Sequence, residues 1–150
     1  MSRPPRTPWL KFSRIVGSVL AGYWIAMAIA THIPVEWMIW RGLDAGGLMA
    51  KGGDKLLHLI AYAGLGFLLC FWIASRGRFS VSAVKAIAIV CVLYAILDEL
   101  LQIPVGRSAD FEDCLADWCG AGLGIMLFAL LFRIAALLRP SLLTNSRESQ

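Results

Sequence analysis

The sequence has few charged residues and lacks the short motifs that mark many metal enzymes. Only 16% of its 150 residues are charged, against roughly 25% in soluble domains. Its four cysteines form no CxxC pair and no zinc-type spacing, and no HExxH sequence occurs. Hydrophobic residues make up 59% of the chain and the mean hydropathy is +0.70. A soluble core of this size cannot bury so much apolar surface, so part of the chain must face lipid.

Four apolar runs are long enough to cross the roughly 30 Å of hydrocarbon in a bilayer. Backbone groups inside a bilayer need internal hydrogen-bond partners, so we expect all four runs to be helices. They cover Ile15–Ile33, Leu56–Ala74, Ala86–Ile103 and Leu115–Leu138. The sequence therefore predicts an all-α integral membrane four-helix bundle over residues 15–138, with an N-terminal arm over 1–14 and a tail over 139–150.

The basic residues predict the orientation of these helices. Ten of the fourteen lie in the N-terminal arm, in the loop after the second span or at the C-terminal end, beside one acid, Glu148. The other side has four basic residues and nine acids. The positive-inside rule then places both termini in the cytoplasm and the protein in the inner (plasma) membrane. This arrangement accounts for the net charge of +4, so we expect no nucleic-acid partner.

The first span has a second interpretation. Its basic flank and the sequence Ala28-Ile29-Ala30 resemble a signal peptide with its cleavage site. The apolar stretch is long for a signal peptide, which favours an uncleaved anchor. Cleavage would leave the other three helices oriented as before.

Polar residues gather at the non-cytoplasmic ends of the second and third spans. Asp54, His58 and Tyr62 follow one another at intervals of four, so they form one stripe on a helix. The third span ends with Asp98, Glu99 and Gln102. Tyr62 fits a packing role equally well, and an isolated histidine is more often a hydrogen-bonded interior residue than a ligand.

The fourth span begins with a similar stripe. Asp110, Asp113 and Asp117 share one face, and the same face continues to Gly120 and Gly124. Small residues at this spacing allow two membrane helices to approach closely, either within the chain or between copies. We therefore expect the acids to point into the bundle.

Helix-end chemistry explains only some of these charges. Asp110 fits the N-cap of the fourth helix, with Asp113 assisting, whereas Lys55 and Glu112 fit solvated flanks. Seven acids nevertheless gather with only Lys55 and Arg107 to oppose them. Such a cluster repels itself unless acids are protonated, lie in a wet cleft or are matched by a bound cation or cationic ligand.

Several of these motifs, in this order, resemble the VanZ-like family of small four-helix membrane proteins. The resemblance covers residues 54–124 and consists of Asp54-Lys55-x-x-His58-x-x-x-Tyr62, Asp98-Glu99-x-x-Gln102 and Gly106-Arg107-x-x-Asp110-x-x-Asp113-x-x-x-Asp117-x-x-Gly120. It implies a cell-envelope protein that contributes to glycopeptide (teicoplanin) tolerance. An outer acidic cleft would bind a lipid-linked or cationic ligand, and Arg107 would contact a phosphate headgroup.

Two other functions stay open from the residues. The donors His58, Asp54, Glu99, Asp113 and Asp117 could hold a divalent metal in a hydrolase acting on a lipid or lipid-linked substrate, although Ser108 is the one obvious nucleophile. Carboxylates inside a bundle also suit a proton-linked transporter. The cytoplasmic halves of the spans are almost purely apolar, which disfavours a transporter built from a single chain. No other cofactor is expected, and the oligomeric state stays open.

Overall fold

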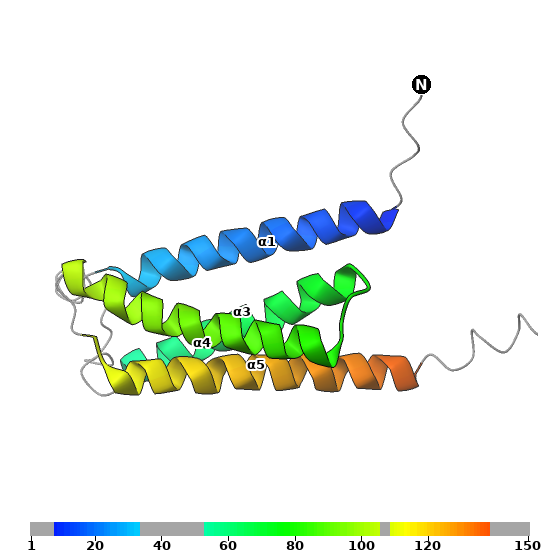
Figure 1. Ribbon diagram of the computed structural model, residues 1–150. Helices are drawn as coiled ribbons and strands as arrows, with labels where there is room; N and C mark the ends of the chain where they lie inside the picture. Colours follow the sequence, from blue (N-terminus) through cyan, green and yellow to red (C-terminus); the bar gives the residue numbers. More distant parts are fainter. Residues whose placement is uncertain (1–7, 34–52, 106–108, 139–150) are drawn as a thin grey trace, which may run out of the picture.

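A computed structural model describes residues 8–33, 53–105 and 109–138, and all regular structure in these ranges is helical (Figure 1). The helices are α1 (Pro8–Thr31), α3 (Gly53–Ser75), α4 (Val81–Gln102), the short 3-10 helix η2 (Ile103–Val105) and α5 (Phe111–Leu137). The four long helices are each long and apolar enough to cross a membrane. The prediction of an all-α membrane protein with four spans is confirmed for the described residues.

Each long helix begins before the apolar run that predicted it. The largest difference is in α1, which starts at Pro8 and not at Ile15. Hydropathy marks only the hydrocarbon-spanning part, whereas a helix continues through polar flanks whose long side chains reach toward water. A proline at the first position removes no helical hydrogen bond, because that N–H has no partner within the helix.

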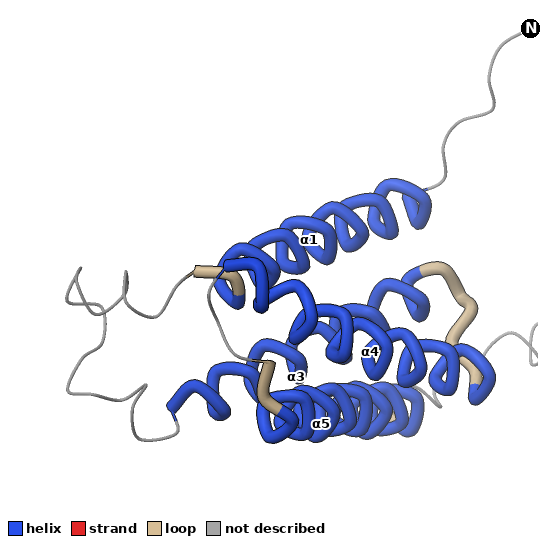
Figure 2. Tube along the Cα trace, turned by 60° about the vertical axis from the view of Figure 1, so that its left-hand side comes forward, coloured by secondary structure: helices blue, strands red, loops and turns tan. Residues whose placement is uncertain are grey.

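Successive long helices run in opposite directions, and α3 and α4 lie between α1 and α5 (Figures 1 and 2). The C-terminal ends of α1 and α4 therefore share one end of the bundle with the N-terminal ends of α3 and α5. We call this the acidic end and the opposite one the basic end. The start of α1 and the end of α5 both lie at the basic end, as a shared side for the two termini requires. Which side of the membrane that is stays a prediction.

Glycines bring the backbones of α3 and α5 into direct contact. A Cβ atom on Gly120 would collide with the carbonyl oxygen of Leu59, and one on Gly124 with that of Ala63. A Cβ atom on Gly66 would lie 2.6 Å from the carbonyl oxygen of Ala121. The glycine face of α5 thus packs within the chain, which was one of its two predicted uses.

The turn at the basic end joins α3 to α4 through standard helix caps. Gly77 adopts a φ of 68°, and the amide of Arg78 donates to the carbonyl oxygen of Ile73. This is the Schellman pattern, in which glycine takes the left-handed position. Ser80 then caps α4 by accepting a hydrogen bond from the Ala83 amide. The two helices are thereby joined antiparallel by a short loop.

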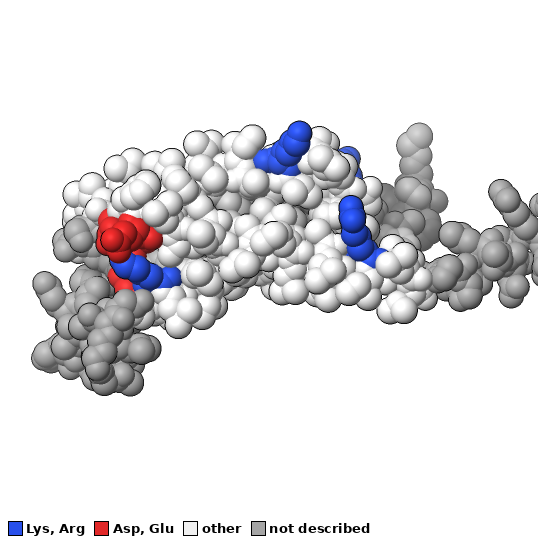
Figure 3. Space-filling model, turned by 90° about the horizontal axis from the view of Figure 1, so that it is seen from below, with Lys and Arg blue, Asp and Glu red and all other residues white. Residues whose placement is uncertain are grey.

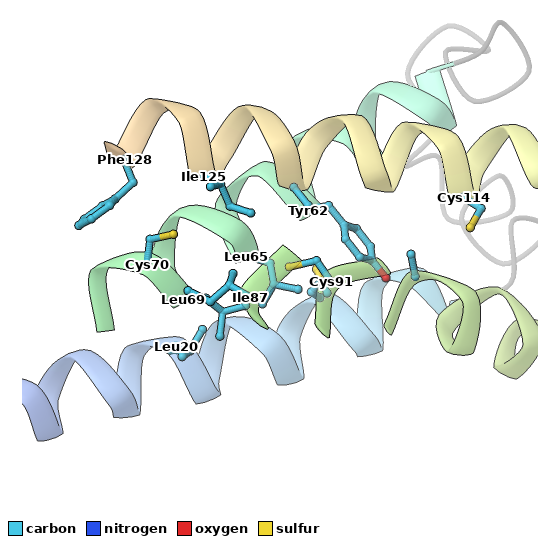
Figure 4. Packing of buried hydrophobic residues seen from close by; sticks show 13 residues of the cluster. Leu20, Tyr62, Leu65, Leu69, Cys70, Ile87, Cys91, Cys114, Ile125 and Phe128 are labelled. Atoms are coloured by element: carbon cyan, nitrogen blue, oxygen red, sulfur yellow. The ribbon is translucent and has the colours of Figure 1, made fainter. Parts of the chain in front are cut away.

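The bundle interior is apolar away from the acidic end. Figure 4 shows side chains such as Leu69, Cys70, Ile87 and Phe128 meeting between the helices, where they are buried. Of the buried polar and charged side chains in the described ranges, all except Ser13 lie at the acidic end. Large apolar side chains on the outer faces, Leu130 among them, are exposed as lipid contact requires.

Candidate functional site

All four long helices bring polar side chains to the acidic end. Figure 3 shows the visible acidic side chains gathered there beside a basic one, with other visible basic side chains toward the opposite end. Among the described residues, four carboxylic acids are buried, together with His58, Gln102 and Thr31. We call the buried set the acid-end cluster: Thr31, His58, Asp98, Glu99, Gln102, Asp113 and Asp117.

Helix electrostatics explain only some of these acids. Asp54 and Asp113 lie in the first turns of α3 and α5, where the positive end of the helix dipole stabilises a carboxylate. Asp98 and Glu99 lie near the C-terminal end of α4, where the dipole disfavours a negative charge. Their presence there requires partners outside α4.

The centre of the cluster is a contact between α3 and α5. The Nδ1 atom of His58 lies 3.0 Å from Oδ1 of Asp117, and both side chains are almost fully buried. The other carboxylate oxygen of Asp117 has no hydrogen-bond partner among the described residues, and neither has the buried hydroxyl of Tyr62. A buried polar group without a partner costs roughly 1–3 kcal/mol, and more when it is charged.

Glu99 connects α4 to the start of α5. One of its carboxylate oxygens accepts a hydrogen bond from the side-chain amide of Gln102 at 3.1 Å. The other accepts from the backbone amide of Asp110 at 2.8 Å. The two bonds fix the orientation of a carboxylate that lies in one compact group with His58 and Asp117, whose potential ligand atoms are all within 4.8 Å of one another.

Thr31 and His32 at the end of α1 are site residues that the sequence analysis missed. The hydroxyl of Thr31 donates to Oδ1 of Asp98 at 3.1 Å, and Nδ1 of His32 lies 3.8 Å from the same oxygen. The feature of the sequence that could have revealed them is a pair of adjacent polar residues at the end of an apolar span. We treated them as part of that span because nothing in the sequence fixes which way the end of α1 faces.

The rim of the site consists of Lys55, Asp110, Glu112 and Asp113, and the surroundings of Lys55 differ from the prediction. Lys55 is not a fully solvated flank charge, because its ammonium group lies 3.3, 3.0 and 3.4 Å from carboxylate oxygens of Asp110, Glu112 and Asp113. Asp110 caps α5, as predicted, by accepting from the Glu112 amide. That hydrogen bond, followed by the one from Lys55, holds the pKa of Asp110 below its ordinary value. Glu112 is exposed, as expected.

An apolar groove between α1 and α3 leads to the polar site. Its volume is about 360 Å³, and Thr31, Asp54 and His58 form its polar part. The rest of its wall is formed by Tyr23, Ala26, Met27 and Ala30 on α1 and by Leu57, Ile60 and Ala61 on α3. His58 therefore belongs both to the groove and to the acid-end cluster.

The structure brings together nearly all of the predicted site residues. His58, Asp98, Glu99, Gln102, Asp113 and Asp117 are buried at the acidic end, Tyr62 lies one turn further in, and Asp54 and Asp110 lie nearer its surface. Arg107 lies outside the described residues. The carboxylates of the cluster face the bundle interior, as the helical spacing predicted.

Comparison with known sequences identifies the family. No curated protein and no solved structure gave a significant match to the chain. The sequence model of the VanZ/LLP1 family matches residues 9–133, which include nearly all of the four long helices and every described residue of the site. With this match over most of its length, the chain belongs to the VanZ/LLP1 family.

Proposed function

We propose that this protein binds a lipid-linked molecule of the cell envelope at the non-cytoplasmic face of the plasma membrane and thereby contributes to teicoplanin tolerance. The acyl or polyprenyl chain of the ligand would lie in the groove between α1 and α3. Its headgroup would reach Asp54 and His58. One observation carries the proposal, namely that a single continuous groove joins an apolar wall to these polar side chains.

The charges at the acidic end favour a headgroup that bears an amine. The rim acids Asp110, Glu112 and Asp113 share the one ammonium group of Lys55. Asp54 lies in the groove wall near these acids, so the groove opens beside a region where acids outnumber basic side chains among the described residues. A primary amine would relieve that excess, whereas an anionic headgroup would add to it.

The burial pattern argues against a proton-linked transporter. Polar side chains gather at one end of the bundle, and the neighbouring interior contains Leu65, Leu69 and Ile87. A proton path needs hydrogen-bonding groups through the whole thickness of the membrane. The described helices of one chain therefore suit a binding site at one surface better than a path across it.

A tolerance assay with matched variants tests the proposal. Expression in a teicoplanin-susceptible Gram-positive host should raise the minimum inhibitory concentration of teicoplanin. Ala30→Phe fills the groove and should abolish the rise, whereas Ala21→Phe, on an exposed part of α1 outside the groove, should not. His58→Gln should also abolish the rise, because His58 lines the groove.

Protein levels in the membrane must be equal in all of these strains. The proposal fails if wild-type expression leaves teicoplanin tolerance unchanged. It also fails if the two alanine variants behave alike, because the groove would then have no part in the phenotype.

A further inference from the structure

The geometry of the acid-end cluster points to a metal site, and we infer that His58, Glu99 and Asp117 bind one divalent transition-metal cation such as Zn²⁺ or Mn²⁺. The three side chains come from α3, α4 and α5, and all are buried. One imidazole and two carboxylates form a donor set that suits borderline divalent metals. The inference concerns a different ligand from the lipid-linked molecule and does not depend on it.

The distances are compatible with a shared ion. Potential ligand atoms of the three residues all lie within 4.8 Å of one another. Nitrogen and oxygen ligands about 2.1 Å from one metal ion are separated by roughly 3–3.5 Å, so the three ligand atoms would have to approach one another by little more than about 1–2 Å.

The unpartnered oxygen of Asp117 is an independent sign of a ligand. Asp117 is fully buried and pairs with His58 through Oδ1, while Oδ2 has no hydrogen-bond partner in the described part of the chain. A carboxylate is expected to use both oxygens when it is removed from water. A cation beside His58 and Glu99 would satisfy the second oxygen and neutralise the two carboxylates.

The surroundings of Glu99 resemble the support that metal ligands have in proteins. The Gln102 side chain and the Asp110 amide each donate to one of its oxygens, and each oxygen keeps a lone pair for a metal. Such bonds orient a ligand carboxylate and tune its affinity. The sequence spacing of Glu99 and Gln102, one helical turn, builds this support into α4.

A second group of donors lies nearer the rim but suits a metal less well. It consists of Asp54, His58 and Asp113, so it competes for the same imidazole. Asp113 is already 3.4 Å from the ammonium group of Lys55, whose positive charge opposes a metal cation. The group of His58, Glu99 and Asp117, which we call the inner group, has no such basic side chain beside it among the described residues.

Metal binding to the purified full chain tests the inference. The protein in detergent is treated with a chelator and titrated with Zn²⁺ and with Mn²⁺, with bound metal measured by calorimetry and by elemental analysis. We expect one equivalent to bind. Asp117→Asn and Glu99→Gln should weaken binding by more than about 100-fold, and Gln102→Ala by about 10–100-fold. Glu112→Gln is the matched control, because its exposed carboxylate lies outside the inner group, and it should retain wild-type affinity.

Two results would overturn the inference. Wild-type protein that binds neither metal would show that a proton or another partner satisfies the buried carboxylates. Equal weakening in Glu99→Gln and Glu112→Gln would place the metal on the rim or on the surface. A visible absorption spectrum with Co²⁺ provides a second readout, because imidazole–carboxylate coordination at a closed site differs from that of the hydrated ion.

Discussion

The contact between Gly120 and Leu59 offers a sharp test of how the fold maintains the site. Replacing Gly120 by alanine puts a methyl group against the backbone of α3, where it would lie 2.9 Å from the carbonyl carbon of Leu59 and even closer to its oxygen. Restoring ordinary contact with that carbon alone, at about 3.5–4.0 Å, requires α5 to move away by roughly 0.6–1.1 Å. Overpacking of this kind costs about 1–3 kcal/mol of unfolding free energy.

Gly122→Ala provides the control on the same helix. A Cβ atom at Gly122 would meet nothing within 4 Å. Alanine also has a higher helix propensity than glycine, so this variant should gain up to about 1 kcal/mol. The two variants should therefore differ by about 1–4 kcal/mol in unfolding free energy. Reversible unfolding with SDS in mixed micelles, followed by far-ultraviolet circular dichroism, measures this difference.

The same substitution should also disturb the site. Leu59 follows His58, and Gly120 lies three residues after Asp117, so a displaced α5 lengthens the 3.0 Å contact between the two side chains. A lengthening of this contact by roughly half an ångström already takes it beyond the usual range of a hydrogen bond. Gly120→Ala should therefore lose tolerance activity while Gly122→Ala keeps it. Equal stability of the two variants, or a less stable Gly122→Ala, would refute the packing that we describe.

Three other predictions concern topology, capping and the end of α1. Green fluorescent protein fused after Gln150 should fluoresce. Alkaline phosphatase should be active when it is fused after Val105 but inactive after Gln150. The reverse pattern would show that the termini lie on the non-cytoplasmic side. Asp110→Ala should lower thermal stability, whereas Asp110→Asn should preserve the cap of α5. Because the pKa of Asp110 is lowered in the folded protein, its contribution to stability should be present above the ordinary carboxyl pKa. That contribution should be lost as the pH falls toward the lowered pKa. Thr31→Val removes a donor to buried Asp98 and should cost about 1–3 kcal/mol in SDS unfolding, whereas no change would show that this bond is dispensable.

Much of the fold could be predicted because lipid imposes simple rules. Runs such as Leu56–Ala74 must be helical. Because successive helices alternate in direction, the C-terminal ends of the first and third spans lie at the same surface as the N-terminal ends of the second and fourth. The interval of four residues between Asp54 and His58, and between Asp113 and Asp117, then indicates which side chains share a face. These local regularities were sufficient to place the polar residues at one end of the bundle.

The rest depends on how the helices meet, which one sequence does not determine. From the sequence, the glycine face of α5 could pack against α3 or against a second copy of the chain. Small residues allow another helix to approach closely, but they do not determine which helix it is. The close approach of α3 and α5 then brings Lys55 to three acids at once. Likewise, the rotation of α1 about its axis decides whether Thr31 meets Asp98 or lipid, and no pattern within α1 reveals it.

Photo-crosslinking tests most directly the central claim that the groove between α1 and α3 holds the chain of a lipid-linked ligand. The purified protein is reconstituted with an amine-bearing phospholipid that carries a diazirine in its acyl chain, irradiated and mapped by mass spectrometry. In wild type we expect adducts enriched on the groove residues Tyr23, Met27 and Ile60. These adducts should be lost in Ala30→Phe but not in Ala21→Phe. Adducts spread evenly over lipid-facing residues such as Leu130, and unchanged by Ala30→Phe, would contradict the claim.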